Sequence, residues 1–299
     1  MADLRLITLQ TDRNEALDNW IYTAKEHDYN YAILGLDEKW GGWSWRTKKY
    51  LHYVESLPSS AIVCITDCND VLFTRPSHEM QNVWAYYQAR GKELVFGGEP
   101  TCCTGNYRFH IDPVGRKNIM TRVKDNSKKV SNGKANRWMF PNAGCVIGTR
   151  DRIVEALTLA KDADDDQARY LEQYALDPHW LSIDYDHKLV GNLNSLAYLY
   201  KESYLPEDYY NAELKHWNFI SVKDYDEMQR VTRVRKPVNR FLLQNNQTGG
   251  IPCVVHFPGK NFVLYNYVGE KLYKGHFKPL DFKDSMTTLW SIKETFGWK

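Results

Sequence analysis

The chain has 299 residues, which is enough for one large α/β domain or two small ones. Its 39 basic and 37 acidic residues leave a formal charge of +2, so charge gives no case for nucleic acid or an anionic membrane as a partner. No apolar run approaches the length of a membrane span, and the start Met-Ala-Asp-Leu-Arg lacks the core of a signal peptide. We therefore expect a cytoplasmic protein.

Two features of composition bear on function. Six cysteines are too few for a disulfide scaffold, and most lie in or beside apolar, strand-like runs where reduced cysteine behaves as a small core residue. Cys102 and Cys103 lack a second Cys/His cluster at zinc-binding spacing. The aromatic content is 14%, with 10 Trp and 20 Tyr, which suits a cleft for a sugar or a nucleobase although most rings belong to a core.

The first 35 residues predict a strand, a helix and a second strand. Residues 4–9 (LRLITL) form an apolar strand, and residues 31–35 form the second one. Between them Asp12 and Glu15 match a capping box, and apolar residues follow at helical spacing up to residue 24. This order is the usual opening of a nucleotide-binding α/β sheet.

The stretch from residue 61 to residue 73 is the centre of the sequence. Residues 61–66 form a short, continuous apolar run, typical of a strand buried on both faces, and they lead directly into Asp67 and Asp70. Ligands of open α/β sheets bind beyond the carboxyl ends of the strands. Two carboxylates in one turn repel each other unless a cation lies between them, whereas an isolated D-x-x-D is often only a helix cap and a turn acid. The apolar runs on both sides favour the cation.

The later elements alternate between helices and strands. Residues 77–89 predict a helix, residues 93–96 a strand that leads to Glu99, and residues 141–148 another strand. We expect residues 100–137 to be irregular, as a lid, a binding loop or a partly disordered segment. Further along we expect helices at 151–160 and from the Asp-rich segment 162–167, strands at 182–184 and 253–256, and a helix in the tail from residue 271.

A histidine joins the acid pair as a candidate metal ligand. His256, like Asp67 and Asp70, follows a predicted core strand, and two carboxylates with one imidazole suit Mn²⁺ or Mg²⁺, the nitrogen favouring Mn²⁺. A lone histidine in this position is more often a hydrogen-bonded core residue, and its company with the acids is what favours the metal. Open positions on such a cation suit a diphosphate, whose remaining charge Lys48, Lys49 and Lys260 could neutralise.

The aspartates of residues 164–166 lie at a predicted helix start, where acids cap the helix and complement its dipole. One carboxylate suffices for a cap. The surplus predicts a second role at the cleft.

Together these segments resemble the amino-terminal glycosyltransferase domain of the multifunctional procollagen lysyl hydroxylases, over about residues 4–267. The matching segments, in chain order, are Ile7-Thr8-Leu9-Gln10-Thr11, Leu34-Gly35-Leu36-Asp37-Glu38-Lys39-Trp40-Gly41-Gly42, Asp67-Cys68-Asn69-Asp70-Val71-Leu72, Gly98-Glu99, Asn142-Ala143-Gly144-Cys145-Val146-Ile147-Gly148, Asp164-Asp165-Asp166-Gln167, Asp184, Asn192-Leu193-Asn194, and Val255-His256 with Gly259. Each motif alone is weak, and their order and spacing make the resemblance specific.

The resemblance implies a type-A glycosyltransferase fold, an α/β fold with a mixed, mostly parallel sheet and helices on both faces. It implies that Asp67, Asp70 and His256 hold Mn²⁺ on the diphosphate of a UDP-sugar. The other implied or candidate site residues are Leu9, Thr11 and Asn69 at the uridine, Lys49 (or Lys48) with Gly259 and Lys260 at the phosphates, Trp40, Glu99, Asn142 and Gln167 on the sugar and acceptor side, and Asp165 and Asp166 as catalytic carboxylates.

The family transfers glucose from UDP-glucose to galactosyl-hydroxylysine of collagen with retention of configuration, and this is the activity we expect. Alternatives are a UDP-galactose hydroxylysine galactosyltransferase and a non-catalytic sugar-nucleotide or collagen-binding module. We expect the transferase domain to span residues 1–270, with residues 271–299 packed on it or on a partner, such as a second copy in a homodimer. No iron-binding hydroxylase domain follows in this sequence, so we expect a stand-alone transferase, with a virus as one conceivable source and the host cytoplasm as its location in that case.

Overall fold

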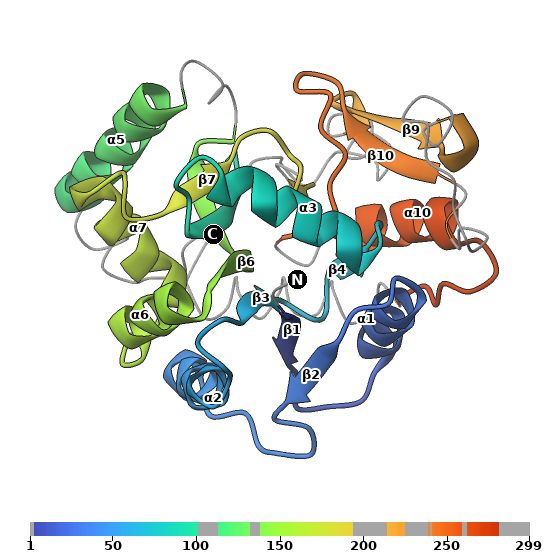
Figure 1. Cartoon of the computed structure of the whole chain (residues 1–299), viewed down its shortest axis with the longest axis horizontal. Helices are drawn as coiled ribbons and strands as arrows, with labels where there is room; N and C mark the ends of the chain where they lie inside the picture. Colours follow the sequence, from blue (N-terminus) through green and yellow to red (C-terminus); the bar gives the residue numbers. More distant parts are fainter. Residues whose placement is uncertain are drawn as a thin grey trace, which may run out of the picture.

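A computed structural model of the chain describes residues 3–100, 113–131, 138–193, 214–224, 239, 241–258 and 262–280 (Figure 1). Its central sheet has six strands in the order β2-β1-β3-β6-β5-β7. The strands are β1 (Leu4–Leu9), β2 (Tyr31–Leu34), β3 (Ile62–Thr66), β5 (Leu94–Glu99), β6 (Phe140–Thr149) and β7 (Ser182–Asp184). Strand β6 is antiparallel to both of its neighbours, and the other pairs are parallel. The predicted α/β class with a mixed, mostly parallel sheet is confirmed.

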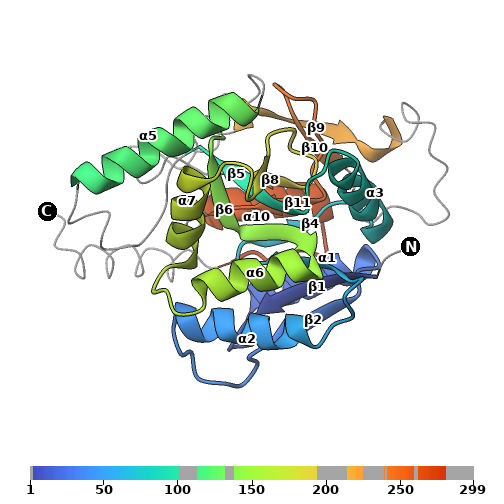
Figure 2. The same ribbon diagram turned by 60° about the vertical axis from the view of Figure 1, so that its left-hand side comes forward.

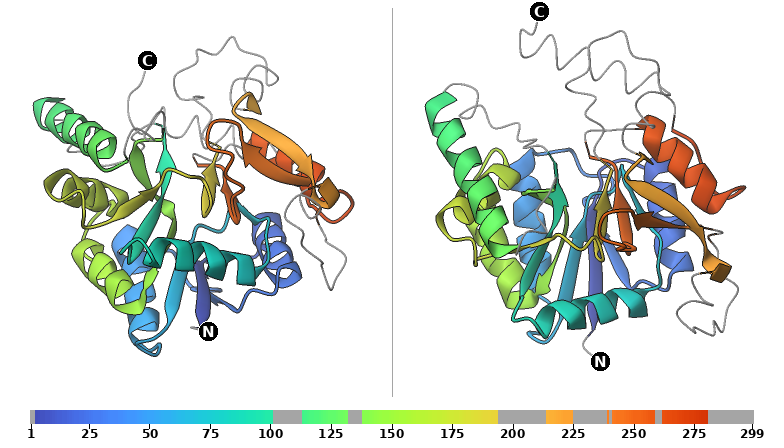
Figure 3. Two further views of the ribbon diagram at one scale, coloured as in Figure 1. Left: turned by 45° about the horizontal axis from the view of Figure 1, so that its top comes forward. Right: turned by 90° about the horizontal axis from the view of Figure 1, so that it is seen from above.

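Helices cover both faces of this sheet because its strands are apolar on both sides. The helices are α1 (Glu15–Glu26), α2 (Trp43–Glu55), α3 (Ser77–Gln88), α6 (Arg150–Ala160) and α7 (Asp166–Leu176). In β3, Val63 and Ile65 belong to the cluster formed with α2, α6 and α7, whereas Ile62 and Cys64 belong to the cluster formed with α1 and α3. This alternation is the period of two expected of a strand buried on both faces. Figure 2 shows α2 and α6 side by side, and Figure 3 shows helices on the two sides of the sheet.

A second sheet continues from the end of β3. Its strands are β4 (Val71–Phe73), β11 (Val254–His256) and β8 (Val190–Asn192), in the order β4-β11-β8. Residues 67–70 form the turn between β3 and β4, so the acid pair lies where the two sheets meet. The register of this sheet places His256 beside Val71 on one side and beside Asn192 on the other. Strand pairing therefore brings His256 to the residue that follows Asp70.

The carboxyl-terminal part of the described chain packs on the second sheet. Helix α10 (Phe262–Tyr273) contributes its buried side chains to a core cluster with residues of β4 and β11. Beyond it, the backbone of Lys278 exchanges two hydrogen bonds with the side chain of Asn19 in α1, at 2.7 and 2.9 Å. Strands β9 (Trp217–Ser221) and β10 (Phe241–Asn245) form an antiparallel pair. Residues 281–299, most of the expected extension, lie outside the described residues.

Four local expectations were wrong. The helix expected from residue 271 instead begins at Phe262 and ends at Tyr273, and residues 274–280 are not helical. Helix α5 (Pro113–Val130) occupies part of the segment expected to be irregular, and contacts with the rest of the fold hold it: Val123 is buried and Asn126 Nδ2 donates to the Tyr174 carbonyl at 2.9 Å. Helix α1 is capped by Asn14, whose side chain accepts from Leu17 N, rather than by Asp12. Helix α6 begins after Thr149, not at Asp151.

Within the described residues, no helix is both long enough and apolar enough to span a bilayer.

Candidate active site

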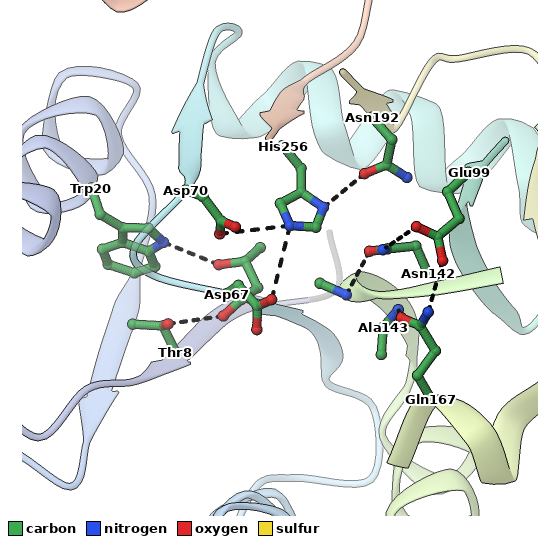
Figure 4. Close-up of polar contacts among 12 residues, drawn as sticks. Thr8, Trp20, Asp67, Asp70, Glu99, Asn142, Ala143, Gln167, Asn192 and His256 are labelled. Carbon is green, nitrogen blue, oxygen red and sulfur yellow. Dashed lines mark hydrogen bonds and ion pairs between the residues drawn. The ribbon is translucent and has the colours of Figure 1, made fainter. Parts of the chain in front are cut away.

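The side chains of Asp67, Asp70 and His256 converge at the junction of the two sheets (Figure 4). One potential ligand atom from each lies within 4.8 Å of the others. Backbone hydrogen bonds fix the turn that carries the acids: Asp67 N donates to Gly144 O, and Phe257 N donates to Asp70 O, both at 2.9 Å. The turn is therefore tied to β6 on one side and to the residue after His256 on the other.

The imidazole of His256 is held with one nitrogen directed at the two carboxylates. Its Nδ1 lies 2.7 Å from Asn192 Oδ1, and the amide group of Asn192 donates to the Gly98 carbonyl at 2.7 Å. Since a carbonyl accepts only, Asn192 must present its oxygen to the ring, and Nδ1 carries the hydrogen. The lone pair of Nε2 is thereby directed at Asp70 Oδ1 (3.6 Å) and Asp67 Oδ2 (3.9 Å).

This donor set fits a divalent cation. The His256 side chain is 2% exposed, and its Nε2 has no hydrogen-bond partner among the described residues, which is costly for a buried polar atom. Two carboxylate oxygens and one such nitrogen match the preferences of Mn²⁺, with Asn192 as the outer partner that ligating histidines usually have. Burial lowers the pKa of His256, and the nearby carboxylates, Asp70 first, raise it by more, so that without a cation the pKa lies above its usual value.

A glycine makes room for the imidazole ring. A Cβ atom on Gly144 would lie 2.2 Å from His256 Cε1 and 2.7 Å from Nε2. Any side chain at this position of β6 would displace the ring. The glycine of the Asn142-Ala143-Gly144 motif is therefore required by the space that the His256 ring occupies.

Three of the residues expected on the sugar side form one hydrogen-bond network, in which Glu99 and Asn142 are buried and Gln167 is partly buried. Glu99 accepts from Asn142 Nδ2 at 3.1 Å and from Gln167 Nε2 at 2.7 Å. The side chain of Gln167 also accepts from Ala143 N at 2.9 Å, and that of Asn142 accepts from Gly144 N at 2.8 Å. Figure 4 shows this network on the far side of His256 from Asp70. The structure therefore brings Glu99, Asn142 and Gln167 together next to the candidate metal ligands.

The two predicted catalytic aspartates occupy different positions at the start of α7. Asp165 is the N-cap, and its Oδ1 accepts from Ala168 N at 3.0 Å. Asp166 faces away from the cap toward α2, where Arg46 Nη2 donates to its Oδ2 at 2.6 Å. Arg46 Nη1 donates to Asp67 Oδ1 at 3.1 Å, so one arginine joins a candidate metal ligand to a candidate catalytic carboxylate. Burial lowers the pKa of Arg46, and Asp166 and Asp67 raise it by more, which keeps the guanidinium charged.

Of the residues expected at the nucleotide, those at the base end lie together. Leu9 is the last residue of β1, and the next residue, Gln10, donates through Nε2 to Asn69 Oδ1 at 2.9 Å. Thr11 follows directly, its hydroxyl donating to Asp12 Oδ2 at 3.2 Å.

The lysines expected at the phosphates form ion pairs away from the candidate metal ligands. Lys49 pairs with Glu38 at 2.6 Å, and Lys48 pairs with Asp162 at 2.8 Å, both on the outer surface of α2. Gly259 and Lys260 lie outside the described residues, as does Asn194 of the motif at residues 192–194.

Aromatic side chains border the site at the start of α2. Trp40 is 45% exposed and makes edge-to-face contacts with Trp43 and Trp45. Trp43, 48% exposed, lies under the guanidinium of Arg46 at 4.4 Å from the ring centre. Asp184, one of the residues that carry the resemblance, is structural: it is buried and accepts from the backbone of Leu189 and Val190 at 2.6 and 2.9 Å.

Arg46 is the residue that sequence reasoning missed. Two residues later, the adjacent Lys48 and Lys49 carry more positive charge than Arg46 alone. Helix periodicity by itself does not say which basic side chain near the start of a helix faces the sheet. The available signal was the position of Arg46 in the first helical turn after Trp40, Gly41 and Gly42. Asn192 was recognised only as part of a motif, and its contact with His256 depends on the pairing of β8 with β11.

Comparison with known proteins gives family matches. Residues 1–110 match the family described as the PLOD GT domain. The chain is 27% identical over 231 residues to the multifunctional procollagen lysine hydroxylase and glycosyltransferase of Caenorhabditis elegans, covering 70% of this chain and 29% of that protein. It is 27% identical over 203 residues to procollagen-lysine,2-oxoglutarate 5-dioxygenase 2 of Homo sapiens, covering 62% of this chain and 24% of that protein. The chain thus spans less than a third of the length of either relative.

Two solved structures are distantly similar, each at 12% identity. The bifunctional glycosyltransferase WbbM matches with a TM-score of 0.40, over 96% of this chain and 51% of that chain. A197 from STIV matches with a TM-score of 0.33, over 59% of this chain and 78% of that chain. Likenesses of this size carry no argument about function. The sequence matches agree with the resemblance that the motifs indicated: residues 1–110 match the PLOD GT domain family, and both relatives are named for procollagen lysine.

Proposed function

We propose that this glycosyltransferase transfers glucose from UDP-glucose to galactosyl-hydroxylysine of collagen or a collagen-like protein, with Mn²⁺ as its cofactor and with retention of configuration. The observation that carries the proposal is the convergence of Asp67, Asp70 and His256, with the buried Nε2 of His256 directed at both carboxylates. The names of the two relatives associate those proteins with procollagen lysine, which supports the acceptor.

In this proposal the metal ligands are Asp67, Asp70 and His256. When bound, Mn²⁺ would hold the diphosphate and stabilise the charge that develops as UDP leaves. The base would lie against Leu9, Thr11 and Asn69 at the end of β1. Lys49 and Lys48 would have to exchange their present acidic partners to approach the phosphates, and Gly259 and Lys260 are the other phosphate candidates.

The sugar and the acceptor would occupy the region between the metal ligands and the start of α7. Asp166 would face the sugar, where a carboxylate can stabilise positive charge developing at the anomeric carbon. Glu99, Asn142 and Gln167 form a preorganised polar wall, and a fixed wall loses little entropy when it binds a sugar. Trp40 would offer a flat apolar face to the acceptor. The domain carrying these residues would extend to about residue 270.

The test is an assay of UDP release with UDP-glucose, UDP-galactose and other UDP-sugars, with and without a galactosyl-hydroxylysine peptide. We expect turnover with UDP-glucose that requires both the peptide and Mn²⁺. In calorimetry, UDP should bind tightly only when Mn²⁺ is present, and Asp67→Ala, Asp70→Ala and His256→Ala should each weaken that dependence.

The other possible functions appear as distinct results of the same assay. Preference for UDP-galactose with bare hydroxylysine would make the chain the transferase that acts first. UDP binding without turnover on any acceptor would make it a binding module. Binding of UDP that is equally tight without a divalent cation would refute the metal assignment.

A further inference from the structure

Arg46 joins two carboxylates that belong to different parts of the site. It lies in the first turn of α2, its Nη1 donates to Asp67 Oδ1 at 3.1 Å, and its Nη2 donates to Asp166 Oδ2 at 2.6 Å. Asp67 follows β3, and Asp166 begins α7. One planar guanidinium therefore links three elements: α2, the end of β3 and the start of α7.

The surroundings of Arg46 hold its side chain in one orientation. The side chain is 11% exposed, and the guanidinium lies over the ring of Trp43 at 4.4 Å. Such stacking favours a planar cation. The Nε atom is buried without a hydrogen-bond partner among the described residues, so both hydrogen bonds of Arg46 to carboxylates come from its terminal nitrogens.

The two oxygens of Asp67 have different partners. Oδ1 accepts from Arg46, whereas Oδ2 faces His256 Nε2 at 3.9 Å. A carboxylate held by one oxygen cannot rotate freely, so the arginine directs the other oxygen toward the candidate cation site. Among the described residues, Arg46 is the single lysine or arginine within ion-pair distance of Asp67 or Asp166.

We propose that Arg46 is a positioning residue, which orients Asp67 for the cation and holds Asp166 at a fixed place relative to it. For its effect on turnover this inference rests on the proposed function. Arg46 acts through the two carboxylates and not by contact with the sugar nucleotide. A lysine in its place would keep the charge but could not span both carboxylates in the fork geometry that a guanidinium provides.

The first experiment separates positioning from charge with Arg46→Lys. We expect kcat to fall by about tenfold or more, because Asp166 is no longer held at the sugar, while the KM for UDP-glucose changes by less than about threefold. A rise in KM at unchanged kcat would place Arg46 on the donor, and an unchanged kcat and KM would show that turnover does not need the fork geometry of the guanidinium. Either result overturns the proposal.

The second experiment needs no turnover and uses Mn²⁺ alone as the probe. Arg46→Lys keeps the positive charge beside Asp67 but loses the fork geometry, and we expect the affinity of this variant for Mn²⁺ in calorimetry to fall by about threefold or more, because Asp67 is no longer oriented. Circular dichroism checks that the variant is folded. Mn²⁺ affinity that is unchanged or tighter overturns the orienting role of Arg46.

Arg152 supplies the matched control for both experiments. It too is an arginine paired with a carboxylate, Glu155, and placed over a tryptophan ring, that of Trp180 at 5.5 Å, but it lies on α6 away from the site. Arg152→Lys should leave kcat and Mn²⁺ affinity unchanged. If the wild-type chain turns over no UDP-sugar, the proposed function fails, and the Mn²⁺ measurement alone decides the role of Arg46.

Discussion

At the scale of single residues, the site depends on how tightly His256 is enclosed. Asn192 fixes the hydrogen on one ring nitrogen, and Gly144 leaves the space that the ring fills. Neither residue offers a ligand to the cation. Their effect is to remove the alternatives open to the imidazole, so that its free nitrogen points at Asp67 and Asp70 before any cation arrives.

Gly144→Ala tests this enclosure directly. The new methyl group would overlap the ring of His256, so we expect Mn²⁺ affinity to fall by about tenfold or more and stability by about 1–3 kcal/mol. Calorimetry with Mn²⁺ and thermal melting measure the two effects. Gly148→Ala is the control on the same strand, since its Cβ would crowd Glu93 O and Ile153, at 3.0 and 3.1 Å, rather than a candidate ligand. Equal Mn²⁺ affinity in the two variants would contradict the steric role of Gly144.

At the scale of elements, two adjacent residues at the start of α7 have different roles. Asp165 caps the helix, and Asp166 reaches Arg46. Asparagine caps a helix about as well as aspartate does. Replacing each aspartate by asparagine therefore separates helix capping from charge at the site.

We expect Asp166→Asn to lower turnover by at least about a hundredfold, on the order of 2.7 kcal/mol of transition-state stabilisation, and Asp165→Asn to have a much smaller effect. Steady-state kinetics measures both, with UDP and Mn²⁺ binding expected to survive in each variant. Melting temperatures identify any loss of the cap. Near-normal turnover in both variants would move the catalytic carboxylate elsewhere, and Glu99 would be tested next.

The loop before α2 is a second element with a testable role. Trp40 is about half exposed and rests edge-on against two other tryptophans, which leaves a face open to a sugar ring. We expect Trp40→Ala to reduce sugar transfer by about tenfold while UDP binding changes little. Leu176→Ala, which removes another exposed apolar side chain, is the control. Equal losses of transfer and of UDP binding in the Trp40 variant would show that the ring supports the fold instead.

At the scale of the whole molecule, the reactivity of the cysteines indicates how tightly the core is packed. Cys64, Cys68, Cys145 and Cys253 are buried and free. Burial raises the pKa of Cys253 to about 12, and burial also raises that of Cys68. Cys145 is hydrogen-bonded to Cys64, and this contact together with burial raises its pKa as well. The expectation that these cysteines are reduced core residues is confirmed.

We expect these four cysteines to resist alkylation at neutral pH in the folded protein, because the thiolate is both scarce and enclosed. Peptide mapping after treatment with iodoacetamide measures each site separately, and the same treatment in denaturant provides full labelling as the reference. Rapid labelling of Cys253 in the folded protein would mean that strand β11, which carries His256, opens under native conditions.

The sequence by itself determined the strands of the central sheet and β11, the order of these elements and the three candidate metal ligands. A short apolar run bounded by acids or glycines is compatible with few structures other than a buried strand. A polar residue directly after such a run then lies at the end of that strand. For the same reason the sequence indicated Asp67, Asp70 and His256 although 186 positions separate the last two. Helix α5 was not predicted, because its polar sequence shows little periodicity and its stability comes from contacts with distant residues.

Only the tertiary structure decided how these residues are held. The partner of His256 depends on the register of β8 and β11, and the bridge made by Arg46 depends on how α2 and α7 approach the end of β3. Both are contacts between segments far apart in the chain. Local propensity carries no information about such contacts, because they form only when the two sheets and their covering helices pack together.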